Sequence, residues 1–248
     1  MIHAFLLIGQ SNMAGQGIID EVPPIENENI KMLVNGYWRK MLVPLHREIP
    51  ASGIGLAESF ADAYAKEHNV TVGLIPCAVG GTSLKEWREG GILYENAVNQ
   101  ARLADRTATI AGVLWHQGER DSRPNLAPLY YEKCMKIFNA LRRDLNLYDV
   151  PFIVGGLGEY LKTHEKEEIR ESFMIVNEEL QRMAQDDPMI GYASSVGLTP
   201  KADNVHLNSA SLREFGLRYY EAFKKLEDPN KIFKEKPNER GRMPVSPL

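Results

Sequence analysis

Residues 4–17 have the sequence AFLLIGQSNMAGQG, which is the clearest single indication of how this chain folds. The first five of them form an unbroken apolar run, as expected for a strand buried on both faces of a sheet. Gly9 ends this run, and a polar, glycine-rich segment suited to a tight turn follows it. We therefore expect a buried strand with a functional loop at its carboxyl end.

Apolar runs and helical patterns alternate through the rest of the chain. Further strands are predicted at residues 70–75, 109–115, 152–154 and 189–193. Amphipathic helices are predicted at residues 55–68, 93–104, 129–145 and 169–183, and after residue 208. Such alternation is typical of a parallel sheet with helices on both faces. We predict an α/β protein: a three-layer α/β/α sandwich with a five-stranded parallel sheet of the flavodoxin-like type.

Two segments do not follow this alternation. Residues 20–50 contain Pro23, Pro24, Pro44 and Pro50, and we predict a long surface loop that covers the functional site. Residues 229–248 contain four more prolines among charged residues. We predict a single domain at residues 1–228, followed by an irregular C-terminal extension at residues 229–248.

The composition excludes several classes of partner. The 248 residues include 29 basic and 33 acidic side chains, so there is no excess of positive charge for binding nucleic acid. No apolar run approaches the roughly 18 residues of a membrane span. We therefore expect neither a nucleic-acid nor a membrane partner. The N-terminal apolar run is too short for a secretory signal, so a cytoplasmic protein is expected, or a secreted one if a signal peptide has been removed.

Cys77 and Cys134 lie in apolar stretches. Two cysteines cannot supply a disulfide framework or a four-cysteine zinc site, so we expect buried free thiols. His116 is a possible metal ligand, but no second His or Cys follows it at ligand spacing. We expect no metal ion and no other cofactor.

Four polar segments follow predicted strands, at residues 9–17, 77–87, 116–122 and 203–206. The carboxyl ends of parallel strands meet at one edge of a sheet, where α/β proteins bind ligands. Ser11 can expose its hydroxyl at a strand-to-helix turn, either as a nucleophile or as a helix N-cap. Asp203 and His206 are spaced so that the carboxylate can orient the imidazole toward a nucleophile.

A serine nucleophile also needs hydrogen-bond donors for the oxyanion that forms in the transition state. The candidate donors are the Ser11 N–H, the backbone of Gly80 and Gly81, and the side-chain amide of Gln117. The Gln117 amide could instead satisfy the backbone of its own loop.

The four segments resemble the conserved blocks of the SGNH hydrolase superfamily. Within it they are most similar to the sialate O-acetylesterase and acetyl xylan esterase family, carbohydrate esterase family 6. The matching motifs are G-Q-S-N-M at residues 9–13, G-G-T followed by Trp87, W-H-Q-G-E-R-D at residues 115–121, and D-x-x-H at residues 203–206. The resemblance extends from about residue 4 to residue 216, with the motifs in the expected order.

The resemblance implies a metal-independent serine esterase with a five-stranded SGNH fold. Ser11, Asp203 and His206 would form its catalytic triad, and the Ser11 N–H, the Gly81 N–H and the Gln117 amide its oxyanion hole. Gly80 is the alternative donor if the loop shifts by one residue. The family often has Gly after the Asp of D-x-x-H, whereas Asn204 stands here. Asn tolerates left-handed backbone, so we expect the turn to be kept.

The implied substrate is an acetylated carbohydrate. Tyr37, Trp38 and Trp87 could form a wall that stacks on sugar rings, or could belong to the core. Glu119 and Asp121 are expected to anchor loops through backbone N–H groups. The alternatives are an inactive carbohydrate-binding protein and an esterase or transacylase for other esters. A nucleotide-binding protein is disfavoured, because residues 9–17 lack the Lys-Ser/Thr ending of a P-loop.

Overall fold

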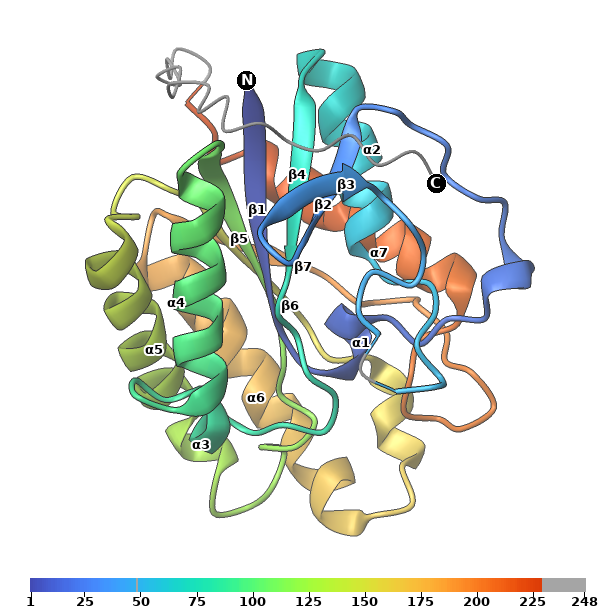
Figure 1. Ribbon diagram of the computed structural model, residues 1–248. Coiled ribbons are helices and arrows are strands. Elements are labelled where there is room, and N and C mark those ends of the chain that lie inside the picture. Colours follow the sequence, from blue (N-terminus) through green and yellow to red (C-terminus); the bar gives the residue numbers. More distant parts are fainter. Residues whose placement is uncertain (48, 229–248) are drawn as a thin grey trace.

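In the computed structural model, which describes residues 1–47 and 49–228, the chain forms a seven-stranded sheet with helices on both faces (Figure 1). All neighbouring strands are parallel except the pair at one edge, β3 and β2. The C-terminal extension predicted for residues 229–248 lies outside the described residues. From edge to edge the order is β3 (Tyr37–Lys40), β2 (Ile30–Val34), β4 (Thr71–Pro76), β1 (Ile2–Gly9), β5 (Thr109–His116), β6 (Phe152–Gly155) and β7 (Ile190–Ala193).

The predicted sandwich is confirmed, but the predicted number of strands is wrong. The five expected strands are present, and two more come from the segment predicted to be a loop. Strands β2 and β3 form a hairpin across Asn35-Gly36, where φ is 51° at Asn35 and 80° at Gly36. Positive φ at both central residues is what a type I′ turn requires, and Asn-Gly is its preferred sequence. Part of the 20–50 segment therefore extends the sheet instead of covering the site.

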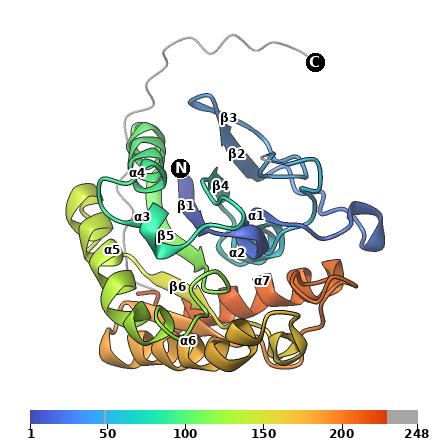
Figure 2. The same ribbon diagram turned by 90° about the horizontal axis from the view of Figure 1, so that it is seen from below.

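The helices form two layers (Figure 2). One layer consists of α3 (Leu84–Trp87), α4 (Ile92–Asp105), α5 (Tyr130–Leu145) and α6 (Glu167–Asp186), and the other of α2 (Ala57–His68) and α7 (Ser209–Lys224). Four short helical turns lie in loops: α1 (Ser11–Ala14), η1 (Ile19–Glu21), η2 (Ala127–Leu129) and η3 (Glu159–Thr163). No helix in the described ranges has the length and apolar character needed to cross a membrane.

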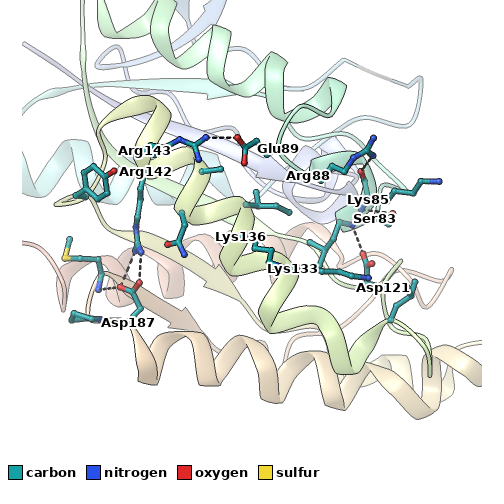
Figure 3. A pocket seen from close by; sticks show the side chains of 18 residues that line it. Ser83, Lys85, Arg88, Glu89, Asp121, Lys133, Lys136, Arg142, Arg143 and Asp187 are labelled. Atoms are coloured by element: carbon teal, nitrogen blue, oxygen red, sulfur yellow. Dashed lines mark hydrogen bonds and ion pairs between the residues drawn. The ribbon is translucent and has the colours of Figure 1, made fainter.

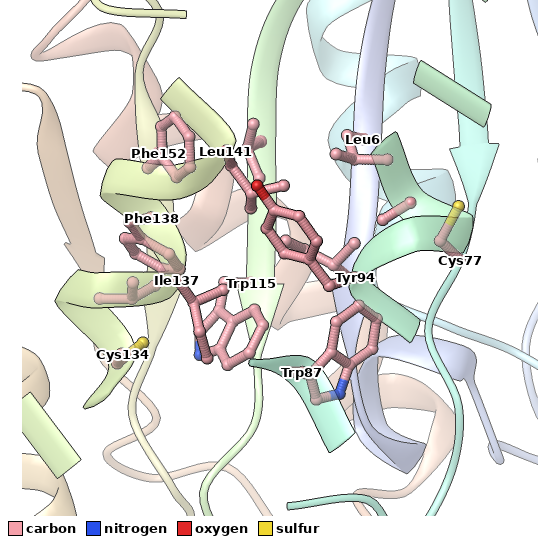
Figure 4. Close-up of a cluster of buried hydrophobic side chains, with 14 of the residues drawn as sticks. Leu6, Cys77, Trp87, Tyr94, Trp115, Cys134, Ile137, Phe138, Leu141 and Phe152 are labelled. Atoms are coloured by element: carbon pink, nitrogen blue, oxygen red, sulfur yellow. The ribbon is translucent and has the colours of Figure 1, made fainter. Parts of the chain in front are cut away.

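Strand β1 contributes to both cores because its side chains alternate between the two faces of the sheet. Leu6 packs in the cluster beneath α4 and α5, whereas Phe5 packs among the aromatic rings of α2 and α7. An edge-to-face pair of rings such as Trp87 and Trp115 adds about 0.5–1.5 kcal/mol to the stability of the fold beyond the burial of the two rings (Figure 4). This packing holds β1 rigidly and therefore also the loop at its carboxyl end.

Both cysteines are buried free thiols, as predicted. Burial raises the pKa of Cys77 to about 12, so its thiol stays protonated and unreactive at neutral pH. Cys134 is fully buried on α5, and burial raises the pKa of its thiol as well.

Candidate active site

The loops after β1 and β5 start from one tightly packed point. Gly9 and His116 are paired across the sheet, and a Cβ atom on Gly9 would lie 2.1 Å from the His116 carbonyl oxygen. Gly9 has φ = 130°, a conformation that favours glycine. The Gln10 N–H then donates to the same carbonyl over 2.8 Å. A residue with a side chain at position 9 would push the two loops apart.

Ser11 is the first residue of α1, directly beyond this point. Its side chain is buried among loop residues and its carbonyl accepts the Gly15 N–H over 2.8 Å, which closes a single helical turn. Gly15 has φ = 91°, and a Cβ atom on it would lie 2.8 Å from the Gly55 Cα, so this turn also depends on glycine. The predicted strand-to-helix turn is therefore present, with Ser11 at its start.

Asp203 and His206 form the predicted pair. Asp203 Oδ2 lies 2.9 Å from His206 Nδ1, and Asp203 Oδ1 accepts the N–H groups of Val205 and His206 over 2.9 Å each. Partial burial acts to raise the pKa of Asp203, but the hydrogen bonds from His206 and Val205 outweigh it and lower this pKa to about 2. The carboxylate is thus ionised, and it holds the proton of His206 on Nδ1, which leaves Nε2 free to accept one.

Asn204 has φ = 52°, which confirms the left-handed turn expected at this position. This turn brings the Lys201 N–H to the His206 carbonyl, at 2.7 Å, and closes a short loop around the pair. The backbone of the loop is further supported by Tyr160, whose hydroxyl donates to the Val205 carbonyl over 3.2 Å.

Asn12 joins the serine turn to the histidine turn. Its Oδ1 accepts the Leu207 N–H over 3.0 Å, and its Nδ2 donates to Glu119 Oε1 over 2.8 Å. Asn12 follows Ser11 and Leu207 follows His206, so this one amide brings the predicted nucleophile and the predicted base into the same site. Sequence reasoning missed it, because the contact spans 195 positions of the chain.

Glu119 and Asp121 anchor loops. Glu119 does so through the Asn12 side chain and not, as predicted, through a backbone N–H group. Burial acts to raise the pKa of Glu119, but the His116 and Asn12 side chains outweigh it and keep this pKa below its usual value. Glu119 therefore holds the Asn12 side chain as an ionised carboxylate. Asp121 Oδ2 accepts the Leu84 N–H, as predicted, at 2.9 Å.

Gln117 lies in the interior, where its amide is already used. Its Nε2 is within hydrogen-bond distance of Asp121 Oδ2 (2.6 Å), Thr82 O (3.1 Å) and Gln10 Oε1 (3.2 Å). An amide nitrogen has only two N–H bonds, so protein acceptors occupy both. In this geometry the Gln117 amide holds three loops together, and its donation to the oxyanion stays a prediction.

Gln10, which directly precedes Ser11, provides a second buried side-chain amide beside the serine turn. Its Oε1 accepts the Gln117 amide and the N–H groups of Gly118 (3.3 Å) and Arg120 (3.4 Å). These three donors tie the Gln10 side chain to the loop after β5. Sequence reasoning considered only Ser11 in this motif and overlooked its neighbour.

The loop after β4 presents Gly81 to solvent at φ = 71°. It is fixed by the Val79 N–H, which donates to the Gly9 carbonyl over 3.0 Å. Thr82 Oγ1 donates to the Val79 carbonyl at 2.8 Å and accepts from Trp87 Nε1 at 3.0 Å. These contacts give the G-G-T…W motif a structural meaning: Trp87 and Thr82 brace the loop that carries Gly81.

His46 is a second brace that sequence reasoning missed. Its ring is buried, with Nδ1 3.1 Å from the Ala14 carbonyl and Nε2 3.1 Å from the Ala78 N–H. These partners require the neutral tautomer with its proton on Nδ1. Burial lowers the pKa of His46 to about 4, although the bond to Ala14 opposes this. A neutral imidazole therefore links the serine turn to the loop after β4.

With this geometry in place, comparison with known proteins identifies the family. A sequence model of the family described as carbohydrate esterase, sialic acid-specific acetylesterase, matches residues 1–225. The chain belongs to this family. A probable carbohydrate esterase of Arabidopsis thaliana is 31% identical over 245 residues, covering 88% of this chain and 89% of that protein. The resemblance to carbohydrate esterases predicted from the four motifs is thus confirmed.

Solved structures support the fold assignment of this esterase. The crystal structure of the Arabidopsis thaliana protein has a TM-score of 0.80 at 29% identity, covering 90% of this chain and 97% of that one. A carbohydrate acetylesterase from Xanthomonas citri has a TM-score of 0.68 at 17% identity, over 90% of this chain and 56% of that one. More distant SGNH-like hydrolases share the same arrangement of sheet and helices.

Tyr37, Trp38 and Trp87 were each predicted either to form a substrate wall or to belong to the core of this esterase. Trp87 is 1% exposed and packs edge-on against Trp115 in the core. Trp38 lies over Gly73 and donates through Nε1 to Thr107 Oγ1 over 3.0 Å, at the end of the sheet where β5 begins. Tyr37 is exposed on the same hairpin. The core alternative therefore holds for Trp87, and a role of Tyr37 and Trp38 in binding substrate stays a prediction.

Two cavities flank the loop after β4. A cleft of about 520 Å³ between the β2–β3 hairpin and α4 reaches Ala78 and Val79, and is also lined by Arg39, Arg47, Asn96 and Gln100. A groove of about 1160 Å³ runs along α5 (Figure 3). Two arginines of this groove are neutralised by ion pairs: Arg142 pairs with Asp187, and Arg143 pairs with Glu89. Ser11, Asp203 and His206 line neither of these two cavities.

The esterase provides no evident metal centre within residues 1–47 and 49–228. Three His, Cys, Asp or Glu side chains that could hold an ion together do not occur there. His116 instead contacts Glu119 at 3.6 Å and Tyr219 at 3.2 Å.

Proposed function

We propose that this chain is a carbohydrate O-acetylesterase that acts through an acetyl-enzyme intermediate on Ser11. The family match supports hydrolysis of acetyl esters of carbohydrates. The single observation that carries the mechanism is the Asn12 amide, which ties the turn of Ser11 to that of the Asp203–His206 pair. An inactive carbohydrate-binding protein would have no need of an ionised carboxylate that holds a histidine in one tautomer.

In the first half of the reaction, Ser11 Oγ attacks the acetyl carbonyl carbon while His206 Nε2 takes the hydroxyl proton. Asp203 stabilises the imidazolium that forms. When the tetrahedral intermediate collapses, the sugar oxygen leaves with the proton from His206, and an acetyl ester remains on Ser11. In the second half, water attacks this ester with His206 again as the base, and acetate is released.

The oxyanion requires donors that are in place before the reaction begins. The Ser11 N–H and the Gly81 N–H supply the backbone part of this hole. Gln10 is a second candidate, beside Gln117, for the side-chain donor, because it directly precedes Ser11 and its Oε1 is held by three donors. Gln117 and His46 keep the donor loops in register.

The test combines kinetics with covalent labelling. The Ser11→Ala variant should lose on the order of 10³-fold or more in kcat toward p-nitrophenyl acetate and acetylated sugars, because only oxyanion and binding contributions remain. A serine-directed phosphonate should add its mass to the peptide that contains Ser11 in the wild type and not in the variant. Near-full activity of Ser11→Ala would refute the mechanism, and activity confined to non-carbohydrate esters would refute the substrate class.

A further inference from the structure

Lys201 lies in the loop that carries Asp203 and His206, and its side chain is directed at the site. Lys201 Nζ donates to the Gln16 carbonyl over 2.9 Å and lies 3.6 Å from Asp203 Oδ2. The Lys201 side chain is 20% exposed, so its ammonium group is partly withdrawn from solvent. Gln16 follows the serine turn, and the lysine therefore links both halves of the triad.

The lysine and the histidine share one carboxylate oxygen. Asp203 Oδ2 is 2.9 Å from His206 Nδ1 and 3.6 Å from Lys201 Nζ. A carboxylate next to a histidine favours the imidazolium form. A second cation at the same oxygen weakens this effect and repels a positive charge on the imidazole. The ammonium group therefore opposes protonation of His206.

Backbone hydrogen bonds fix the main chain of Lys201 relative to Asp203 and His206. The Lys201 N–H donates to the His206 carbonyl over 2.7 Å, and the Asn204 N–H donates to the Lys201 carbonyl over 3.1 Å. Pro200 and Leu207 form an isolated β-bridge immediately outside this ring. Lys201 thus belongs to a closed loop, and the bond from its Nζ to the Gln16 carbonyl restrains its side chain.

Other charged or titratable groups face this loop from its neighbours. Tyr160 from η3 donates its hydroxyl to Val205, and burial raises its pKa, so it is neutral. Glu119 and His116, from the end of β5 and the loop that follows, reach the histidine turn through Asn12. Glu21 from η1 accepts from Ser209 at the start of α7. These groups stay constant when Lys201 is changed, so a difference between variants reports the lysine alone.

We propose that Lys201 is a positioning residue that disfavours the imidazolium form of His206 and so extends the activity of this esterase to lower pH. The proposal rests on the proposed function, in which His206 is the general base. A base that is protonated cannot accept the proton of Ser11, so the acid limb of kcat/KM follows the proton affinity of His206. Lys201 moves that limb toward lower pH.

The test measures kcat/KM for p-nitrophenyl acetate against pH in the wild type, Lys201→Met, Lys201→Arg and Lys66→Met. In Lys201→Met the acid limb should move up by about 0.3–1 pH unit, a partial effect because the site is partly exposed. Activity on that limb should then fall about 2–10-fold. Lys201→Arg keeps the charge and should keep the limb. Lys66 pairs with Asp62 on α2, so Lys66→Met removes one positive charge and should leave the profile unchanged.

A second measurement does not depend on catalysis. The His206 Hε1 resonance, assigned by its loss in His206→Asn, is titrated by NMR in Ser11→Ala with and without Lys201→Met. A rise of about 0.3–1 pH unit in the midpoint supports the proposal. An unchanged midpoint, or a fall in kcat with an unmoved acid limb, would overturn it and leave the lysine as a structural tie. Failure of the proposed function would instead appear as full activity in Ser11→Ala.

Discussion

The Asn12→Asp substitution should convert an attractive buried contact into a repulsive one without changing the shape of the side chain. Asn12 Nδ2 donates to Glu119 Oε1 over 2.8 Å, and both side chains are buried. A hydrogen bond to a charged group contributes about 1.5–3 kcal/mol. Two carboxylates relaxed to about 4 Å repel by about 4 kcal/mol at an effective dielectric constant of about 20. The free energy of unfolding should therefore fall by roughly 5–7 kcal/mol at pH 8.

This loss should depend on pH in a defined direction. One of the two carboxyl groups can relieve the repulsion by holding a proton, which raises its pKa in the folded state above its value in the unfolded chain. The folded variant then binds more protons than the unfolded variant, so its stability rises as the pH falls. Each unit below pH 8 should restore up to about 1.4 kcal/mol, until the pair holds a proton.

Urea unfolding followed by tryptophan fluorescence at pH 8, 7, 6 and 5.5 measures the difference from the wild type. The double variant Asn12→Asp/Glu119→Gln provides the control, because it exchanges amide and carboxylate and keeps an acceptor for the Leu207 N–H. It should recover most of the loss at every pH. A difference that is constant with pH, or a double variant no more stable than Asn12→Asp, would refute the contact.

Three further predictions follow from the site. Burial keeps His46 neutral in the folded state down to about pH 4, whereas the unfolded chain binds its proton near pH 6.5. The folded state should therefore lose up to about 3 kcal/mol as pH falls through this window, and His46→Gln should remove that part of the urea-unfolding pH dependence. Gln10→Ala should lower kcat by roughly 10²–10³-fold with little change in KM, and an effect confined to KM would make Gln10 a substrate-binding residue. Acetate esters should be cleaved faster than butyrates and octanoates hardly at all, since burial gains only about 0.8 kcal/mol per methylene and selectivity must come from steric exclusion; a kcat/KM that rises with acyl length would contradict the acetylesterase assignment.

The parts of this structure that the sequence predicts are those encoded by local patterns. Buried strands appear as apolar runs, and the turn at Asn204 follows from the ability of asparagine to adopt positive φ. The Asn35-Gly36 hairpin was also encoded locally, but the prolines around it favoured the interpretation as a loop. The sequence could not decide between substrate wall and core, because an aromatic side chain looks the same whether it is exposed, like Tyr37, or buried, like Trp87.

The parts of the site that could not be predicted from the sequence depend on contacts between distant segments. The bond from Asn12 to Leu207 and the bonds of His46 to Ala14 and Ala78 exist only once the sheet has brought the loops together. Gln117 is a related case. Its position after β5 was predicted, but its hydrogen-bond partners come from other loops, so its actual role could not be derived from its own neighbourhood.

The β2–β3 hairpin also has a consequence for self-association. A sheet edge with unpaired N–H and C=O groups is a template for strands of other molecules. β2 has mostly buried side chains and would offer such an edge. β3 covers it with a strand of only four residues that ends in exposed Arg39 and Lys40, which discourages a further strand from pairing there. The hairpin therefore protects the sheet against fibril-like growth, and weakening its Asn35-Gly36 turn should make this edge a site of aggregation.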